Sequence, residues 1–296
     1  MQFEKDIQRS RSLKSAGFTL VELMTASAVG LAVTAGSITL MVNQRAYHTA
    51  HRQLTDARQN TSYAITTVSR DVRMAGYGLN IEPSELDEWV NWIPGFTSNP
   101  LIEDGANGAP DGMLIAGAFE RGYAELVSGI TTGDTAMTVI SLDGSDLLFN
   151  DSNNKILFLG KNETVRISHP PVGAGSIMTL SISTDPSTID GVRFAYPAGT
   201  RVELVKMVQY EWVPPSVSSM PYPYLTRRDL SESIQLSGLW EVSSAYIDDF
   251  QVDVSGGAYF VRVTGITEKL DKDYLHPNKN DHYRRTTMTT KVSPRN

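Results

Sequence analysis

The sequence predicts an α+β protein in which a long N-terminal α-helix, apolar in its first half, packs on an antiparallel β-sheet head that carries an additional β-rich module. Three observations lead to this fold class. Residues 18–42 contain a single charged side chain and no proline. The apolar periodicity of a helix continues from there to about residue 75. From residue 111 onward, short runs of β-forming residues alternate with turn residues.

The composition is that of an ordinary globular protein, and it excludes several kinds of chemistry. Of the 296 residues, 41% are hydrophobic and 20% are charged, and the formal net charge is -7. An acidic chain is a poor binder of phosphate backbones, so we expect no nucleic-acid partner. The absence of cysteine excludes disulfides, zinc–thiolate sites and a cysteine nucleophile. No nucleophile-elbow or paired-carboxylate pattern occurs, so we expect that the protein is not an enzyme.

The N-terminal apolar stretch is long enough to cross a membrane. As a helix, residues 18–42 measure about 37 Å, and the hydrocarbon core of a bilayer is about 30 Å thick. Beyond this stretch, small or apolar residues recur on one helix face, namely Ala46, Ala50, Leu54, Ala57, Ala64, Ile65, Val68, Val72 and Ala75. Gly76 and Gly78 then supply a stop. The pattern predicts one helix over 18–78, which spans the membrane over 18–42 and is amphipathic afterwards.

The charges around the apolar stretch predict its orientation. Residues 1–17 are basic on balance, whereas the rest of the chain is acidic, which keeps the N-terminus cytoplasmic while the body is exported. An ordinary secretory signal cut near Ala35 and a plain signal anchor are alternatives. Two features count against the secretory signal. Glu22 places a costly carboxylate inside the apolar stretch, and the helical periodicity continues through Ala35.

The residues around position 17 resemble a known processing site. The ten residues from Lys14 to Leu23, KSAGFTLVEL, are similar to the cleavage motif of type IV prepilins. The resemblance implies that residues 1–17 are a leader peptide, that prepilin peptidase cuts between Gly17 and Phe18, and that Phe18 is then N-methylated. It also implies a pilin-like, lollipop-shaped fold in which Glu22 is an assembly contact.

The charges alone give Glu22 a role that does not depend on the resemblance. A cut after Gly17 leaves an ammonium group on Phe18 within an apolar segment, where an unpaired charge is expensive. Glu22 lies about 6 Å further along the helix axis. The carboxylate of an axially staggered neighbouring chain can therefore offset the ammonium of Phe18.

Two further strings indicate which pilin-like subunit this is. Residues 69–78 (SRDVRMAGYG), together with the C-terminal Tyr283-Arg284-Arg285 and residues 292–296, resemble PilW-type minor pilins. The resemblance implies a structural subunit that primes pilus assembly and lies near the tip, and that serves twitching motility. The implied partners are other minor and major pilins, prepilin peptidase and the inner-membrane assembly platform.

The same resemblance implies a location. The chain would be a single-pass protein of the bacterial inner membrane with a periplasmic C-terminus, and would then move to the pilus (fimbrium) at the cell surface. Two other functions stay open. One is a minor pseudopilin of a type II secretion system. The other is a pilus-borne subunit for cell adhesion or DNA uptake.

The body of the chain divides at stretches rich in proline and glycine. We expect an irregular connecting loop over 79–110, a β-rich inserted module over 111–213, and the C-terminal β-sheet region of the head over 214–296. Strand-like runs in the module include 136–141, 155–159, 163–168, 176–183 and 200–208. Their spacing favours an antiparallel sandwich or a small barrel. In the last region, alternating residues on both sides of Ser255-Gly256-Gly257 predict a β-hairpin.

Two groups of residues were considered as metal ligands. His48 and His51 are spaced to share a helix face, but only Asp56 lies near them to complete a set. An Asx-rich cluster over 143–154 offers oxygen ligands for calcium, yet its spacing does not match an EF-hand, and turn formation explains it equally well. We expect no metal site and no cofactor, with calcium at this cluster as the open alternative.

Overall fold

The fold was obtained as a computed structural model. It describes residues 18–79, 98–118, 123–142, 156–160, 163–174, 176–184, 190–216, 220–230, 241–269, 276–277, 279 and 281–294. The chain forms two compact units, Met1–Arg52 and Gln53–Asn296. The leader over 1–17, with Gly17, and the Asx-rich cluster over 143–154 lie outside the described residues.

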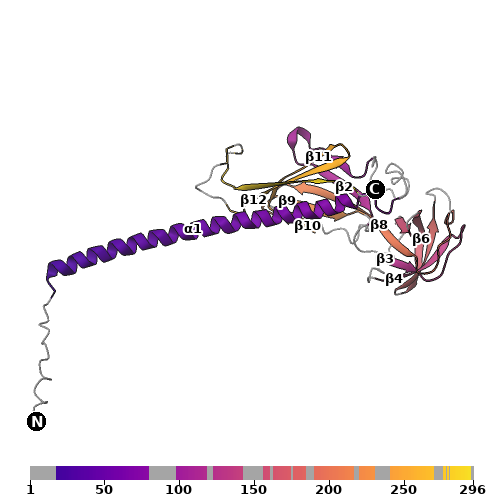
Figure 1. The fold of residues 1–296 in the computed structure, drawn as a ribbon, viewed down its shortest axis with the longest axis horizontal. Helices are drawn as coiled ribbons and strands as arrows, with labels where there is room; N and C mark the ends of the chain where they lie inside the picture. The colour runs from indigo at the N-terminus through magenta and orange to yellow at the C-terminus, as the bar shows by residue number, and fades with distance from the viewer. Residues whose placement is uncertain are drawn as a thin grey trace, which may run out of the picture. The chain divides into compact units, whose positions relative to one another are not determined.

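A single long helix begins the described chain, as the sequence predicts. Helix α1 (Leu20–Arg73) has 54 residues and is drawn from indigo to purple in Figure 1. It ends before the predicted limit of 78, because residues 74–78 form turns in place of further helix. Gly76 and Gly78 both have a φ of 78°, a left-handed conformation that glycine adopts without a steric penalty.

The buried face of α1 begins later than the apolar periodicity suggests. Among the expected stripe residues, Ala46 is exposed and Ala50 is only partly buried. The residues of α1 that are buried are Ala57, Thr61, Ala64, Val68, Ser69, Asp71 and Val72. The stripe that packs on the head therefore starts at Ala57.

Strands make up the rest of the described chain. They are β1 (Leu101–Glu103), β2 (Gly112–Gly117), β3 (Tyr123–Leu126), β4 (Ala136–Ser141), β5 (Ile156–Leu159), β6 (Glu163–Ala174), β7 (Ile177–Ser183), β8 (Arg201–Val213), β9 (Tyr224–Asp229), β10 (Glu241–Ala245), β11 (Ile247–Ser255), β12 (Ala258–Ile266) and β13 (Arg285–Val292). A short 3-10 helix, η2 (Ala106–Gly108), lies between β1 and β2. The result is the α+β class that the sequence predicts, with one helix followed by strands.

Six of the strands close into a barrel. They follow the order β8-β3-β4-β7-β6-β5, and β5 pairs back onto β8. Every pairing in this ring is antiparallel, so the sheet closes without a free edge. Figure 1 shows β3, β4, β6 and β8 gathered at one end of the head. Of the two expected architectures, sandwich or small barrel, the structure has the barrel.

The barrel has its own apolar core. Side chains from the six strands and from nearby loops fill it, namely Ala124, Leu126, Ile130, Met137, Val139, Leu157, Leu159, Val165, Ile167, Met178, Leu180, Ile182, Val192, Tyr196, Val202 and Leu204. Glu163 is buried beside them and accepts hydrogen bonds from the backbone N–H of Arg193 (2.6 Å) and from the hydroxyl of Tyr196 (3.1 Å). The interior is packed with side chains, as expected of a barrel of this size.

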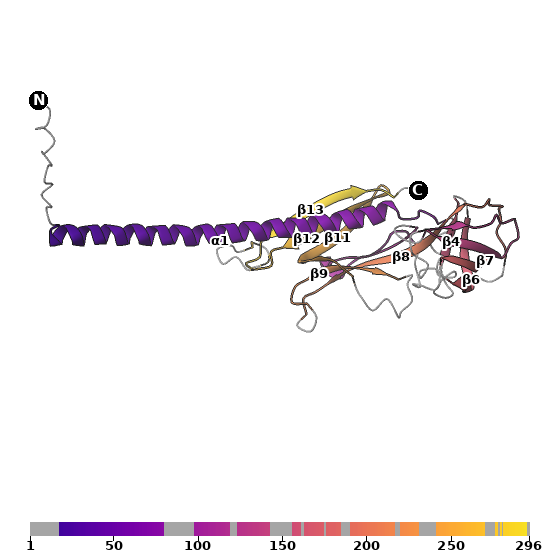
Figure 2. The ribbon, with the colours of Figure 1, turned by 90° about the horizontal axis from the view of Figure 1, so that it is seen from below.

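Strand β8 belongs both to the barrel and to the sheet beneath α1. Its first residues pair with β3 and β5, as in Val202 opposite Ala124 and Leu159. Its later residues pair with β2 and β9, as in Tyr210 opposite Met113 and Arg227. Figure 2 shows β8 running out of the barrel toward β9. The predicted inserted module of 111–213 thus contributes strands to both parts, and whether it folds alone stays a prediction.

A second sheet completes the head. Strands β11, β12 and β13 pair antiparallel in this order, and β11 and β12 form the predicted hairpin. Its turn residues Gly256 and Gly257 both have positive φ, which the tight turn requires. The later turns of α1 lie along this sheet in Figure 2. Their close approach is visible at Gly265 of β12, where an added Cβ atom would collide with Thr61 of the helix.

Candidate functional site

The N-terminal end of α1 is built around Thr19 and Glu22. The Glu22 Oε2 atom accepts hydrogen bonds from the backbone N–H (2.9 Å) and the hydroxyl (3.0 Å) of Thr19. In return, the Thr19 hydroxyl oxygen accepts from the backbone N–H of Glu22 (3.2 Å). This reciprocal pair is a capping box, which satisfies N–H groups that the first helical turn leaves without partners. Within the described residues, the second oxygen of Glu22, Oε1, has no hydrogen-bond donor.

The other polar side chains of the apolar stretch are satisfied by their own helix. Each hydroxyl donates to the carbonyl oxygen four residues earlier, at 2.7 to 2.9 Å, from Thr25, Ser27, Thr34, Ser37 and Thr39. Hydrogen bonds of this kind let Ser and Thr sit in hydrocarbon without an unpaired donor. Glu22 is the one charged side chain of residues 20–42, and its Oε1 atom can pair with a cation from outside.

The first half of α1 presents a continuous apolar surface. Every residue from 18 to 49 is exposed, and the exposed large side chains include Phe18, Leu20, Val21, Leu23, Met24, Val29, Leu31, Val33, Ile38, Leu40, Met41 and Val42. The helix is long and apolar enough to cross a membrane near the N-terminus. An apolar surface of this extent needs a membrane or partner subunits to cover it. The structure thus supports a single membrane-spanning helix.

The predicted processing site is described only in part. Gly17 lies outside the described residues, whereas Phe18 precedes the helix and is 85% exposed. Phe18 and Glu22 are about one helical turn apart along the chain. Cleavage, methylation and the assembly contact stay predictions.

The C-terminal end of α1 carries a buried charge network around Asp71, within the string 69–78 that resembles minor pilins. Asp71 is fully buried, and its Oδ2 atom accepts from the Tyr210 hydroxyl (2.6 Å) and from Arg227 Nε (2.9 Å). Its Oδ1 atom accepts from Arg70 Nε (3.1 Å). Burial, and then the carboxylate of Asp71, raise the pKa of Tyr210 well above its usual value, so the phenol keeps its proton and donates it.

This network ties the helix to the sheet. Tyr210 lies on β8 and Arg227 lies opposite it on β9. The apolar core around it joins Val68 and Val72 of α1 to residues of both sheets, such as Ile115 and Phe250. The sequence held a signal for this role, because Asp71 lies three residues after Val68 and so falls on the apolar face of the helix. The Asp71 network therefore fixes the last turn of α1 on the head.

The candidate metal ligands on α1 are not gathered into a site. The ring of His51 makes an edge contact with Tyr47, with centroids 4.4 Å apart. In the part of the chain that the structure describes, no group of three or more His, Asp or Glu side chains is arranged to hold a metal ion. The Asx-rich cluster proposed for calcium lies outside that part.

Comparison with models of protein families, with curated proteins and with solved structures finds no match. Three features of the chain itself bear on its function: the satisfied hydroxyls of the apolar stretch, the open oxygen of Glu22, and the exposed apolar surface around them.

Proposed function

We propose that this chain is a PilW-type minor subunit of a bacterial type IV pilus, which helps to start pilus assembly and ends near the pilus tip. One observation carries the proposal. In an apolar stretch whose hydroxyls are all bonded to its own backbone, a single carboxylate keeps an oxygen open to an outside partner. A carboxylate is costly to bury in lipid, and a helix that serves only as a membrane anchor does not require one.

The proposed mechanism begins with processing of the leader. Prepilin peptidase hydrolyses the bond between Gly17 and Phe18, and the released amino group of Phe18 is protonated and later methylated. Glu22 then has two roles. Its Oε2 atom caps its own helix at Thr19, while Oε1 accepts the ammonium of a neighbouring subunit. The pair cancels both charges, so both helices can stay in an apolar environment.

Assembly then covers the apolar surface of the first half of α1. In the membrane, lipid covers the exposed side chains of residues 18–42. In the filament, the helices of neighbouring subunits replace the lipid, and small residues such as Ala28, Gly30 and Gly36 permit close approach. The head, which has its own packed core, remains in the periplasm during this exchange.

The barrel favours a place at the tip over a place in the filament body. A subunit that repeats along the filament has to pack its head against the next head at every step. The barrel strands, β3 to β7 with the first part of β8, add a second packed core to the head. A terminal subunit can carry such an addition with fewer neighbours to accommodate. The resemblance of residues 69–78 and of the C-terminus to minor pilins points in the same direction.

A deletion strain tests the proposed function. We expect loss of surface pili and of twitching motility, both restored when the intact gene is supplied again. Loss of exoprotein release with normal pili would instead identify a secretion pseudopilin. Piliated, motile cells that fail only in adhesion or DNA uptake would identify a specialised pilus-borne subunit. Either of the last two results would overturn the assembly-priming role.

A further inference from the structure

A cavity of about 660 Å³ lies at one end of the β11–β13 sheet. Its walls come from the end of β8, the segment before β9, and the adjoining ends of β11, β12 and β13. Its size falls within the range of about 300–1,000 Å³ that is typical of small-ligand sites. Four aromatic side chains line it, namely Trp212, Tyr222, Tyr246 and Tyr283.

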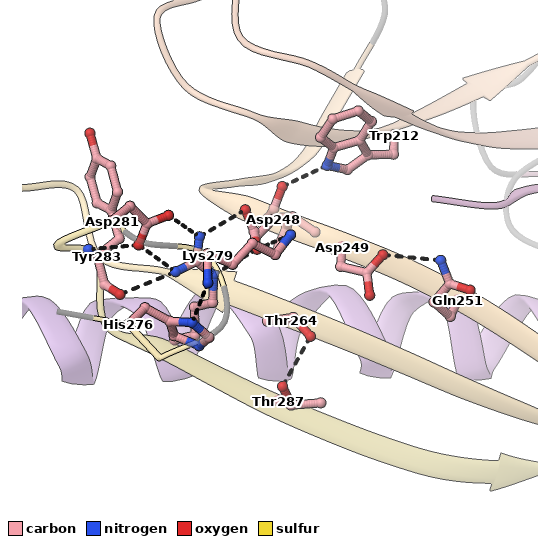
Figure 3. Close-up of polar contacts among 12 residues, drawn as sticks. Trp212, Asp248, Asp249, Gln251, Thr264, His276, Lys279, Asp281, Tyr283 and Thr287 are labelled. Atoms are coloured by element: carbon pink, nitrogen blue, oxygen red, sulfur yellow. Dashed lines mark hydrogen bonds and ion pairs between the residues drawn. The ribbon is translucent and has the colours of Figure 1, made fainter. Parts of the chain in front are cut away.

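The aromatic wall is held in position by the backbone. The rings of Tyr222 and Tyr246 are stacked, with centroids 4.3 Å apart. Tyr246 has a φ of 58°, which is uncommon for a bulky residue. Hydrogen bonds fix it there, since its carbonyl oxygen accepts from the N–H of Ile266 (2.8 Å). Beside it, Trp212 Nε1 donates to the carbonyl oxygen of Ile247 at 2.8 Å (Figure 3).

Part of the charge in the cavity is already neutralised. Arg285 donates to Asp248 Oδ2 and to both oxygens of Asp281, each at 2.7 Å. Lys279 Nζ lies 3.6 Å from Asp248 Oδ2 (Figure 3). The hydrogen bonds from Arg285 lower the pKa of Asp281 to about 2, so its carboxylate stays ionised at neutral pH. Two carboxylates and two basic groups thus offset each other.

Two further carboxylates remain without a basic partner among the described residues. Asp249 Oδ1 accepts only from the side-chain amide of Gln251, at 3.1 Å (Figure 3). Burial raises the pKa of the Tyr246 phenol, and the nearby negative charge of Glu268 raises it further. The cavity therefore combines aromatic faces with two unbalanced negative charges.

We propose that this cavity binds an organic cation, that is, an ammonium or guanidinium group carried on an apolar body such as a lysine or arginine side chain. The cation pairs with Asp249 and Glu268 and lies against the aromatic wall, where a ring face attracts positive charge. An anion is repelled by the two carboxylates. A neutral ligand would remove them from water without supplying a partner charge. The proposal does not depend on the pilus assignment.

The test is a calorimetric titration of the full chain in detergent micelles. The probes are the capped tripeptide Ala-Lys-Ala, its norleucine analogue, which keeps the stem but lacks the charge, and spermidine as a free amine. We expect the lysine peptide to bind at least about tenfold more tightly than the norleucine peptide. Binding should weaken as salt is raised, because the carboxylates are partly exposed. If spermidine binds as tightly as the lysine peptide, the source of the cation is a free amine. If spermidine binds more weakly, the source is a peptide.

Variants locate the binding. The double variant Asp249→Asn/Glu268→Gln should lose about tenfold in affinity for the lysine peptide. The matched control is Asp253→Asn, which removes a 74% exposed carboxylate on the same strand outside the cavity and should bind normally. Thermal unfolding of each variant checks that the head is intact. Equal affinity for the lysine and norleucine peptides, no binding of any cation, or equal loss in the double variant and the control would overturn the proposal.

Discussion

Replacing Asp71 with alanine is expected to lower the free energy of unfolding of the head by about 3–5 kcal/mol, because it removes the anion from a buried ion pair. Arg227 is only 10% exposed and would keep its positive charge without this carboxylate. The Tyr210 hydroxyl would lose its acceptor in the same step. Urea unfolding of the purified chain in detergent, followed by near-ultraviolet circular dichroism, measures the change.

Neighbouring substitutions separate the buried charge from the other contacts of Asp71. Asp71→Asn keeps the shape and should still cost most of the loss, since the charge is gone. Tyr210→Phe removes one donor while Arg227 still serves the carboxylate, so about 1–3 kcal/mol is expected. Arg70→Ala removes a partner that is 56% exposed, and less than about 1 kcal/mol is expected. An Asp71→Ala protein as stable as Arg70→Ala would contradict the anchoring role.

Replacing Glu22 with alanine is expected to exclude the subunit from filaments without preventing its cleavage or membrane insertion. Cleavage depends on the bond after Gly17, and insertion becomes slightly easier when an ionisable group leaves the span. Assembly fails because the Phe18 ammonium of a neighbour loses its partner. At 4 Å and an effective dielectric constant of about 20, the pair contributes roughly 4 kcal/mol before desolvation. One buried unpaired charge costs about 3–5 kcal/mol, or more than about a hundredfold in association.

The capping box supplies matched controls for Glu22. Glu22→Gln can still bond to Thr19, because glutamine also completes a capping box, but it carries no charge. Thr19→Val removes the cap and keeps the charge. We expect Glu22→Gln to be nearly as damaging as alanine and Thr19→Val to assemble almost normally. The measurement is the amount of each variant in sheared pili, relative to the amount in membranes. Wild-type levels of the Gln variant would show that the charge is not the contact.

The helix could be predicted from the sequence because its signals are local. The apolar run and the stop at Gly76 act within a few positions of the bonds they control. The prediction placed the helix over 18–78, and the structure places it at Leu20–Arg73. The prediction of the face that packs on the head was less accurate. Ala46 fits the periodicity, yet burial depends on where the head begins, and this is not encoded in residues 43–56 themselves.

The barrel could be predicted only as one of two possibilities. The runs at 136–141 and 176–183 match β4 and β7 within one residue. Closure is a long-range property, since Val202 of β8 has to pair with both Ala124 and Leu159. Neither short-range spacing nor alternation determines such partners. β8 also continues to Val213, beyond the expected end at 208, because its later residues stay paired, with β2 up to Tyr210 and with β9 up to Val213.

The cavity was not predicted because its residues have no common sequence pattern. Trp212 lies on β8, Tyr246 lies between β10 and β11, and Glu268 follows β12, so the three meet only in the folded head. The stacked ring of Tyr246 depends on a left-handed backbone conformation that glycine or asparagine would ordinarily mark. Here a tyrosine adopts this conformation, so the residue type at position 246 did not indicate a turn.

The N-terminal residue of the mature chain tests the central claim most directly. Protein purified from membranes should begin at Phe18 and carry a methyl group on its amino nitrogen, as read by N-terminal sequencing and intact mass. A chain that begins at Gly36 would mean that an ordinary secretory signal had been removed. A chain that still carries residues 1–17 would be a plain membrane anchor. Either result would contradict the proposal that Phe18 and Glu22 form the contact between subunits.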